Sequence, residues 1–258
     1  MLSVADGDRV VGAVRRPDRL RELIDAHPGR VTAVAFDVTD TARAAAVVQE
    51  VIDEHSRIDV LVNNAGRTQV GALEETTDDE LRALFDLHFF GPAALTRAVL
   101  PHLRRQGGGT VVQMSSVGGQ VTAPGFGAYC ATKFALDGLT ETLSQEVDFG
   151  VRFIIVEPGA FRTNLFAPDA AYQSAEMPEY AETVGPTREY VRTGGGSQTG
   201  DPAKAAHAIL TAINSDAPPL RLVLGADAIS GIDDRLNRLR AELRHWEPVV
   251  GRATAFDD

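Results

Sequence analysis

The sequence has few cysteines, few basic residues relative to acidic ones and no long apolar run, and each of these absences excludes a class of protein. It has one cysteine, Cys130, in 258 residues, so no disulfide can form within the chain. Basic residues are fewer than acidic ones, 25 against 36, and the formal net charge is -11. Such a surface disfavours general binding to nucleic acid or to an anionic membrane. No apolar run approaches the roughly 18 residues of a membrane span, and no basic-then-apolar leader is seen. We therefore expect a cytoplasmic protein that is not bound to a membrane.

The chain also lacks internal repeats, low-complexity tracts and a recognisable linker. With 44% hydrophobic and 24% charged residues, its 258 residues can bury a full core as one unit. We expect a single domain over residues 1–258.

Apolar strand-like runs alternate with helical patterns along most of the chain. This alternation predicts an α/β fold with a doubly wound parallel sheet. The expected strands lie near residues 8–14, 31–36, 58–62, 110–114, 151–157 and 220–224. The expected helices lie near residues 17–27, 40–56, 77–105 with a break around Gly91-Pro92, 127–149, 201–214 and 227–245.

Residues 164–200 form the longest segment without such a pattern, and they are rich in Pro, Gly, Ser and Ala. The segment follows a predicted strand end, where open α/β sheets place their ligands. We interpret it as a candidate substrate lid, followed by a C-terminal strand and helix over about 201–245. Its large apolar residues either favour an apolar or aromatic substrate or pack within the lid: Leu165, Phe166, Tyr172, Met177 and Tyr180.

Tyr129 and Lys133 carry the clearest chemical signal. They stand four residues apart in the predicted first turns of a helix, so both side chains leave the same face. An ammonium beside a phenol favours the phenolate and lowers the tyrosine pKa from its usual value of about 10. Tyr129 is then a candidate general acid or base. Taken alone, such a pair is more typical of a solvated helix surface. Cys130, between Tyr129 and Ala131, is interpreted as a packing residue.

Ser116 follows the apolar run 110–114, and the glycines after it allow a substrate oxygen to approach closely. Three motifs then follow one another: Asn63-Asn-Ala-Gly66, the set Ser116, Tyr129 and Lys133, and Pro158-Gly159. Their order and separations resemble those of the short-chain dehydrogenase/reductase family, over about residues 8–165. By themselves, the asparagine-rich and Pro-Gly motifs would be only turn signals.

The resemblance implies a Rossmann-like fold, a nicotinamide cofactor and a role for each motif. Tyr129 would donate a proton to a carbonyl, and Ser116 would polarise the substrate oxygen. Lys133 would lower the pKa of the tyrosine and hold the nicotinamide ribose. Further cofactor contacts are implied for Asp37, Val38, Asn64, Ala65, Gly66, Pro158, Gly159 and Thr163.

Arg15 and Arg16 bear on which dinucleotide is bound. In the family, residues at the end of the strand that corresponds to residues 8–14 contact the adenosine ribose. An acidic residue there selects NAD, whereas an arginine binds the 2′-phosphate of NADP. The chain has no acid at this point and has two arginines. Arg19 and Arg21 continue the basic run, as they also would at a solvated helix start. We expect NADP as the cofactor, with NAD as the alternative.

The family's first strand and its glycine-rich phosphate turn have no counterpart in the sequence. Residues 5–8 read as the close of a helix, with Gly7 suited to the position just past it. The glycines at 107–109 and 194–196 do not stand between a strand and a helix, as a phosphate-binding turn does. Either the chain lacks its true beginning or it has lost ordinary cofactor binding. The first is favoured, because a missing central strand would expose backbone polar groups of both its neighbours.

His88 stands where the family commonly has an asparagine that holds a water of the proton relay. An imidazole can also donate or accept a hydrogen bond, and its pKa near 6.5 would add a pH dependence. A structural histidine is an equal alternative.

The combined prediction is an NADP-dependent oxidoreductase that interconverts an alcohol and a carbonyl on a small apolar substrate, without a metal. By family resemblance we expect a homodimer or homotetramer. A catalytically idle relative acting as a binding or regulatory subunit is the alternative, although Ser116, Tyr129 and Lys133 argue against it. An epimerase or dehydratase of the longer family branch would need a larger C-terminal substrate domain.

Overall fold

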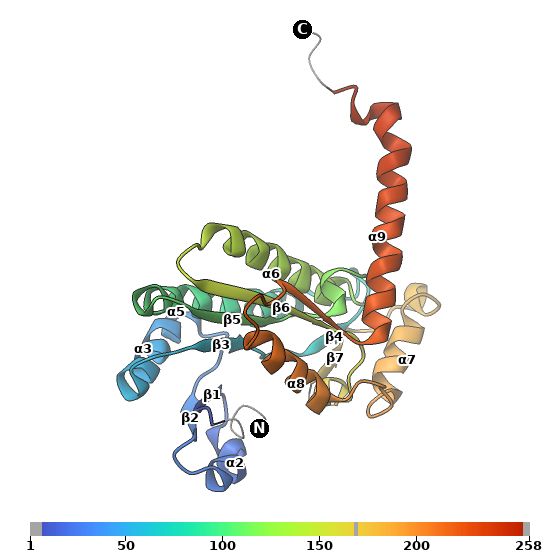
Figure 1. Ribbon diagram of the computed structural model, residues 1–258. Coiled ribbons are helices and arrows are strands. Elements are labelled where there is room, and N and C mark those ends of the chain that lie inside the picture. The colour runs from blue at the N-terminus through green and yellow to red at the C-terminus, as the bar shows by residue number, and fades with distance from the viewer. Residues whose placement is uncertain (1–6, 168–169, 255–258) are drawn as a thin grey trace.

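Parallel strands flanked by helices make up this computed structural model, which describes residues 7–167 and 170–254 (Figure 1). The predicted α/β class and Rossmann-like arrangement are confirmed. The largest sheet has four parallel strands in the order β3, β5, β6, β8. Their bounds are Val60–Asn63, Gly109–Met114, Val151–Pro158 and Arg221–Leu224. Val111, Val112, Ile154 and Ile155 in its centre are fully buried, as expected for strands covered on both faces.

A second sheet pairs β1 (Val10–Val14) with β2 (Val31–Ala35), Val10 lying opposite Val31. Within the described residues, no strand joins this pair to β3. β3 is therefore an edge strand, and Val62 on it is 48% exposed. The gap between the two sheets lies where the family would have its first strand, which has no counterpart in this sequence.

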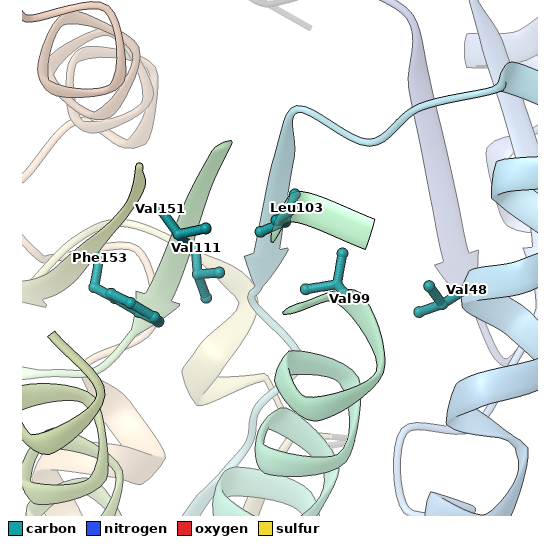
Figure 2. Close-up of a cluster of buried hydrophobic side chains, with 6 residues drawn as sticks. All are labelled: Val48, Val99, Leu103, Val111, Val151 and Phe153. Carbon is teal, nitrogen blue, oxygen red and sulfur yellow. The ribbon is translucent and has the colours of Figure 1, made fainter. Parts of the chain in front are cut away.

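Helices cover both faces of the four-stranded sheet. α5 (Gly91–Gln106) and α6 (Gly127–Glu146) pack on one face, with α3 (Ala44–His55) beside α5, and α8 (Pro202–Ile213) packs on the other. Figure 2 shows the core on the first face, formed by Val48, Val99, Leu103, Val111, Val151 and Phe153. A separate apolar cluster holds β2 against α3 and α5, so the two-stranded sheet is fixed by side-chain packing instead of strand pairing.

Residues 77–106 differ from the predicted helix with a break at Gly91-Pro92. α4 (Asp78–Phe85) begins with a capping box between Thr77 and Glu80. The interruption is a π-helical segment, η3 (Asp86–Phe90), and Gly91 and Pro92 form the first turn of α5. The chain is helical through Phe90, and the backbone N–H of Gly91 donates to the oxygen of Asp86, so the π-helical turn directly precedes Pro92, which has no N–H to donate.

Residues 164–200 are more regular than predicted. β7 (Ala171–Gln173) pairs in parallel with β4 (Thr68–Val70), and α7 (Gly185–Thr193) follows. The other helices are α2 (Arg21–Ala26) and α9 (Ala226–Trp246), and none that the structure describes is long and apolar enough to cross a membrane. The short segments are η1 (Pro17–Leu20), η2 (Thr41–Arg43), η4 (Val117–Gly119), η5 (Asn164–Phe166), η6 (Pro178–Tyr180) and η7 (Glu247–Gly251).

Candidate active site

A cavity of about 420 Å³ lies at the carboxyl ends of β3, β5 and β6. This is where open parallel sheets place their ligands. The cavity brings together eight of the predicted site residues: Asn64, Gly66, Ser116, Tyr129, Lys133, Pro158, Gly159 and Thr163. They come from segments up to 99 positions apart in the sequence, between Asn64 and Thr163.

Ser116 is positioned by the turn that follows β5. Its Oγ accepts a hydrogen bond from the backbone N–H of Gly118, 3.0 Å away. A Cβ on Gly118 would lie 3.1 Å from Cε1 of Tyr129, and one on Gly119 would lie 2.3 Å from Oδ2 of Asp137. The two glycines therefore let the serine turn lie directly against α6.

Burial dominates the acidity of Tyr129. It raises the pKa of the phenol to about 12, more than a hydrogen bond from Ser116 lowers it. The His88 ring lies edge-on at a centroid distance of 5.5 Å, and Phe126 lies at 6.1 Å. The prediction of a lowered tyrosine pKa is therefore wrong for this arrangement. At neutral pH the phenol is protonated, which is the state of a proton donor.

Within the described residues, Lys133 forms no hydrogen bond with the tyrosine hydroxyl. Its Nζ donates to the backbone oxygen of Met114 at 2.8 Å and lies 5.7 Å from the centroid of the Tyr129 ring. Burial lowers the pKa of Lys133 to about 8, although the Asp137 carboxylate opposes that shift. An ammonium has three donors. Those not used by Met114 can serve a ligand in the cavity.

Asp137 stands four residues beyond Lys133 on α6 and was not singled out from the sequence. Arg221 of β8 contacts it at 3.1 Å and also pairs with the buried Glu157 of β6. Gln120 donates to both carboxylate oxygens of Glu157 at 2.8 Å. Burial raises the pKa of both carboxyl groups, and the guanidinium opposes the shift. The cluster fixes α6 against the sheet directly behind the cavity.

Both ring nitrogens of His88 have hydrogen-bond partners. Its Nδ1 lies 2.9 Å from the Thr132 hydroxyl, which itself donates to the backbone oxygen of Tyr129 at 2.7 Å. The backbone N–H of Arg67 donates to Nε2 at 3.2 Å. These partners assign the proton to Nδ1 of a neutral ring. Burial, followed by the charges of Lys133 and Arg67, lowers its pKa well below the usual value. The contacts favour the structural alternative over the relay.

Arg67 follows Gly66 directly and is a cavity residue that the sequence reasoning missed. Its guanidinium carbon lies 4.1 Å from the centroid of the Tyr172 ring on β7. Its Nε is buried and has no hydrogen-bond partner within the described residues. Arg67 and Lys133 are the charged side chains of the lining, and no carboxylate lines the cavity within the described residues. The cavity is therefore positive in an acidic protein.

Five predicted cofactor contacts do not line this cavity: Arg15, Arg16, Asp37, Val38 and Ala65. Arg15 and Arg16 follow β1, and Asp37 and Val38 follow β2, so these four gather at the carboxyl end of the two-stranded sheet. A hydrogen bond from the Thr39 backbone lowers the pKa of Asp37, with a smaller contribution from Arg15. Val38 packs against Gly91 at the start of α5.

A dinucleotide fits the described residues at its two ends but not at its middle. The donors of Lys133 and the turn after β6 suit a nicotinamide and its ribose, and Arg15 and Arg16 suit an adenosine phosphate. The segment 115–127 leads from β5 into α6 and contains glycines, but its turn holds Ser116 against Tyr129. Within the described residues, no Gly-x-x-x-Gly-x-Gly turn joins a strand to a helix N-terminus that could receive a pyrophosphate. Gly107–Gly109 connect α5 to β5, and residues 194–196 follow α7.

Comparisons with known proteins agree with this geometry. A family model described as short chain dehydrogenase matches residues 2–173. Oxidoreductase BOA17 of Botryotinia fuckeliana is 35% identical over 246 residues, covering 95% of this chain and 89% of that protein. The crystal structure of a short-chain dehydrogenase from Streptomyces avermitilis is 55% identical, with a TM-score of 0.92 over 98% of this chain and 92% of that one.

Solved structures of similar fold contain both dinucleotides. A gluconate 5-dehydrogenase from Burkholderia cenocepacia, in complex with NADP and tartrate, is 27% identical, with a TM-score of 0.59 over 63% of this chain and 66% of that one. The crystal structure of a short chain dehydrogenase/reductase from Burkholderia phymatum in complex with NAD is 20% identical, with a TM-score of 0.77 over 91% of this chain and 86% of that one.

Proposed function

The chain belongs to the short-chain dehydrogenase family and is an oxidoreductase acting on CH–OH or C=O groups, and on this premise we propose that it uses NADP to interconvert a small alcohol and the corresponding carbonyl compound. The observation that carries the proposal is the gathering of Ser116, Tyr129 and Lys133 around one cavity at the strand ends. The cofactor, when bound, supplies or accepts the hydride.

The chain's own residues hold the oxygen and move the proton. Tyr129, protonated at neutral pH, donates its proton to the developing alkoxide in the direction of reduction. Ser116 donates a hydrogen bond at the same oxygen. Lys133 keeps a positive charge beside this region at pH 7, where an alkoxide or phenolate would otherwise be poorly compensated. His88 packs edge-on against the ring of Tyr129 and is linked through Thr132 to the backbone oxygen of the same residue.

Two features of the cavity favour a substrate with an apolar body and one anionic group. Met114, Phe161, Leu165 and Phe166 supply the apolar lining, which supports the expectation of an apolar substrate. Arg67 supplies a cation with an unpaired buried N–H, which suits a carboxylate. Of the other lid residues, Tyr180 packs in an apolar cluster that joins the lid to Val70 of β4.

The preference for NADP is supported by the two arginines at the carboxyl end of β1 and by the lack of an acidic residue directly beside them. Residues 1–258 are proposed to act as one domain, with 164–200 as its lid and 201–245 as a C-terminal strand and helix. Assembly as a homodimer or homotetramer and a place in the cytoplasm stay predictions from family resemblance and composition.

A catalytically idle binding or regulatory subunit remains the second candidate, because the described residues provide no pyrophosphate turn. Titration with NADPH distinguishes the two functions. Saturable binding at micromolar concentration favours the enzyme, and undetectable binding favours the subunit.

Tyr129→Phe tests the mechanism. The variant keeps the ring against His88 and Phe126 but lacks the acid, so turnover of NADPH with a panel of aldehydes and ketones should fall at least about a hundredfold. NADPH affinity should change little. Tyr172→Phe, which removes a hydroxyl from an exposed lid tyrosine, is the matched control. Near-normal turnover by Tyr129→Phe would overturn the mechanism.

A further inference from the structure

Helix α9 begins against the body of the protein and then leaves it (Figure 1). Ala228 and Ile232 in its first two turns are buried. From Leu236 to Trp246 every side chain is exposed. About three turns of a regular helix therefore lie free of the described part of the chain.

Apolar residues follow a heptad pattern along this helix and into η7. Spaced alternately three and four positions apart are Ile229, Ile232, Leu236, Leu239, Leu243, Trp246 and Val250. This spacing places them on one face of the helix and is the pattern of a coiled-coil seam.

We call Leu236, Leu239, Leu243 and Trp246 the α9 stripe; their exposed fractions are 38%, 42%, 70% and 55%. Single exposed apolar side chains are ordinary on a surface, but a continuous stripe of them marks an interaction site. The stripe continues the face on which Ile232 is buried against the body.

Charged residues flank the stripe at positions that face a partner helix in a coiled coil. Asp233 and Arg240 flank it on one side, and Arg235 and Glu242 on the other. None of the four forms an ion pair within the described part of the chain. Arg235 lies 5.3 Å from the centroid of the Phe134 ring.

The order of these charges discriminates between two ways of pairing identical helices. In a parallel pair in register, Arg235 would face Arg240 of the second copy, and Glu242 would face Glu247. In an antiparallel pair with Leu236 opposite Leu239, Asp233 would face Arg240 of the second copy, and Arg235 would face Glu242. Like charges oppose each other in the first arrangement and opposite charges in the second.

We propose that the α9 stripe binds a second copy of this chain, with the two α9 helices antiparallel. The two-fold symmetry of such an interface makes every contact occur twice. Trp246 of each copy then lies near Ile229 of the other, which is 59% exposed. This interface is independent of the active site and of the proposed reaction.

Sedimentation equilibrium of the full chain tests the interface. For the wild type we expect an association step that depends on protein concentration and that the variant Leu239→Glu with Leu243→Glu lacks. Both residues are exposed, so the fold should survive, which far-UV circular dichroism checks. Ala241→Glu, on the opposite face of the same exposed turns, is the matched control and should associate as the wild type does. Equal masses for the wild type and the double variant would overturn the proposal.

Charge reversal tests the orientation. In the antiparallel pair, Arg235→Glu places two acidic groups together at two symmetric positions, and the dissociation constant should rise about tenfold. Adding Glu242→Arg should restore it. In a parallel pair the same single variant would face Arg240 and tighten the association. Tightening by Arg235→Glu, or no recovery in the double variant, rejects the antiparallel arrangement.

A membrane surface is the other occupant that an exposed apolar stripe with arginines beside it could take. Vesicles of phosphatidylserine and phosphatidylcholine provide the probe. Vesicle binding by the wild type that is lost in the Leu239→Glu and Leu243→Glu variant, without any self-association, would assign the stripe to a lipid surface and overturn the proposal.

Discussion

Tyr129 and Lys133 are both desolvated at the cavity, where Lys133 is buried and Tyr129 is half-buried. Burial favours the neutral form of each group, so it raises the pKa of the tyrosine and lowers that of the lysine. As a result the pKa of Lys133 moves toward the physiological pH range, whereas the pKa of Tyr129 moves away from it. The pH dependence of the free enzyme should therefore report Lys133.

The value of kcat/KM for carbonyl reduction should fall above about pH 8, because Lys133, whose pKa is lowered to about 8, is an ammonium below that pH and loses its proton above it. Tyr129, with a pKa of about 12, stays protonated through the same range. Initial rates at low substrate concentration over a series of buffers give the profile. Lys133→Met should be less active at pH 7 and should lack the transition. A wild-type profile that is constant across the lysine transition would contradict this assignment.

Arg67 should determine how well anionic substrates are used. We expect Arg67→Gln to lower kcat/KM for a keto acid by about tenfold or more, because a charge-assisted hydrogen bond contributes about 1.5 to 3 kcal/mol. The methyl ester of the same keto acid should be affected little. Arg162→Gln is a control, since that guanidinium is engaged by the backbone oxygen of Gln198. An equal loss for acid and ester would show that Arg67 only supports the lid.

At the level of elements, a buried ion pair holds the proposed lid in place. Nη2 of Arg188 on α7 lies 2.6 Å from Oε2 of Glu75, and both side chains are at most 3% exposed. Glu75 also accepts from the backbone N–H of Ala72 and Met177. Burial opposes ionisation of Glu75, but these hydrogen bonds and Arg188 leave its pKa lowered. Its stabilising contribution is therefore present at neutral pH and is lost as the pH falls through the folded-state pKa.

Arg188→Met should loosen the lid, because Glu75 loses a charged partner that contributes about 1.5 to 3 kcal/mol. Hydrogen exchange of residues 171–193 should become faster, and KM should rise more than kcat falls. Arg192→Met on the same helix is the matched control, since its pair with Glu189 is more than half exposed on both sides. Unchanged exchange in the lid of Arg188→Met would contradict the anchoring role.

The main elements could be predicted because their signals are local. The strands β5 and β6 are apolar runs, and α6 has its two functional residues at helical spacing. β4 and β7 have three residues each and pair across about a hundred positions, so neither has a pattern of its own. α7 was missed because its segment is rich in Pro, Gly and Ser, and its buried residues, Arg188 and Val191, include a charged one.

For the whole molecule, a dinucleotide would have to reach across two separate sheets. In the proposed binding mode, its nicotinamide end would lie in the cavity at β3, β5 and β6, and its adenosine end would lie beside the residues after β1 and β2. The two sheets are joined through apolar packing on α3 and α5. If this binding mode holds, changes beside β1 should alter the choice of cofactor without disturbing the chemistry in the cavity.

Arg15→Ala with Arg16→Ala should weaken NADPH binding by about tenfold or more and leave NADH binding nearly unchanged, because each charge-assisted contact to the 2′-phosphate contributes about 1.5 to 3 kcal/mol. Fluorescence titration with both cofactors gives the comparison. Arg19→Ala with Arg21→Ala removes the same charge from the same basic run and is the control. Equal weakening for NADPH and NADH would show that Arg15 and Arg16 are surface charges only.

The sequence by itself determined the α/β class, the positions of the main strands along the chain and the gathering of Ser116, Tyr129 and Lys133, because periodicity and short spacings fix which side chains share a strand end or a helix face. Only the tertiary structure decided the direction of the pKa shift of Tyr129, the engaged state of His88, the presence of Arg67 in the cavity and the free stripe on α9. These properties depend on burial and on contacts between residues far apart in the chain, such as Glu75 with Arg188 and Arg67 with Tyr172, and no local pattern encodes how deeply a side chain is covered or by which distant neighbour.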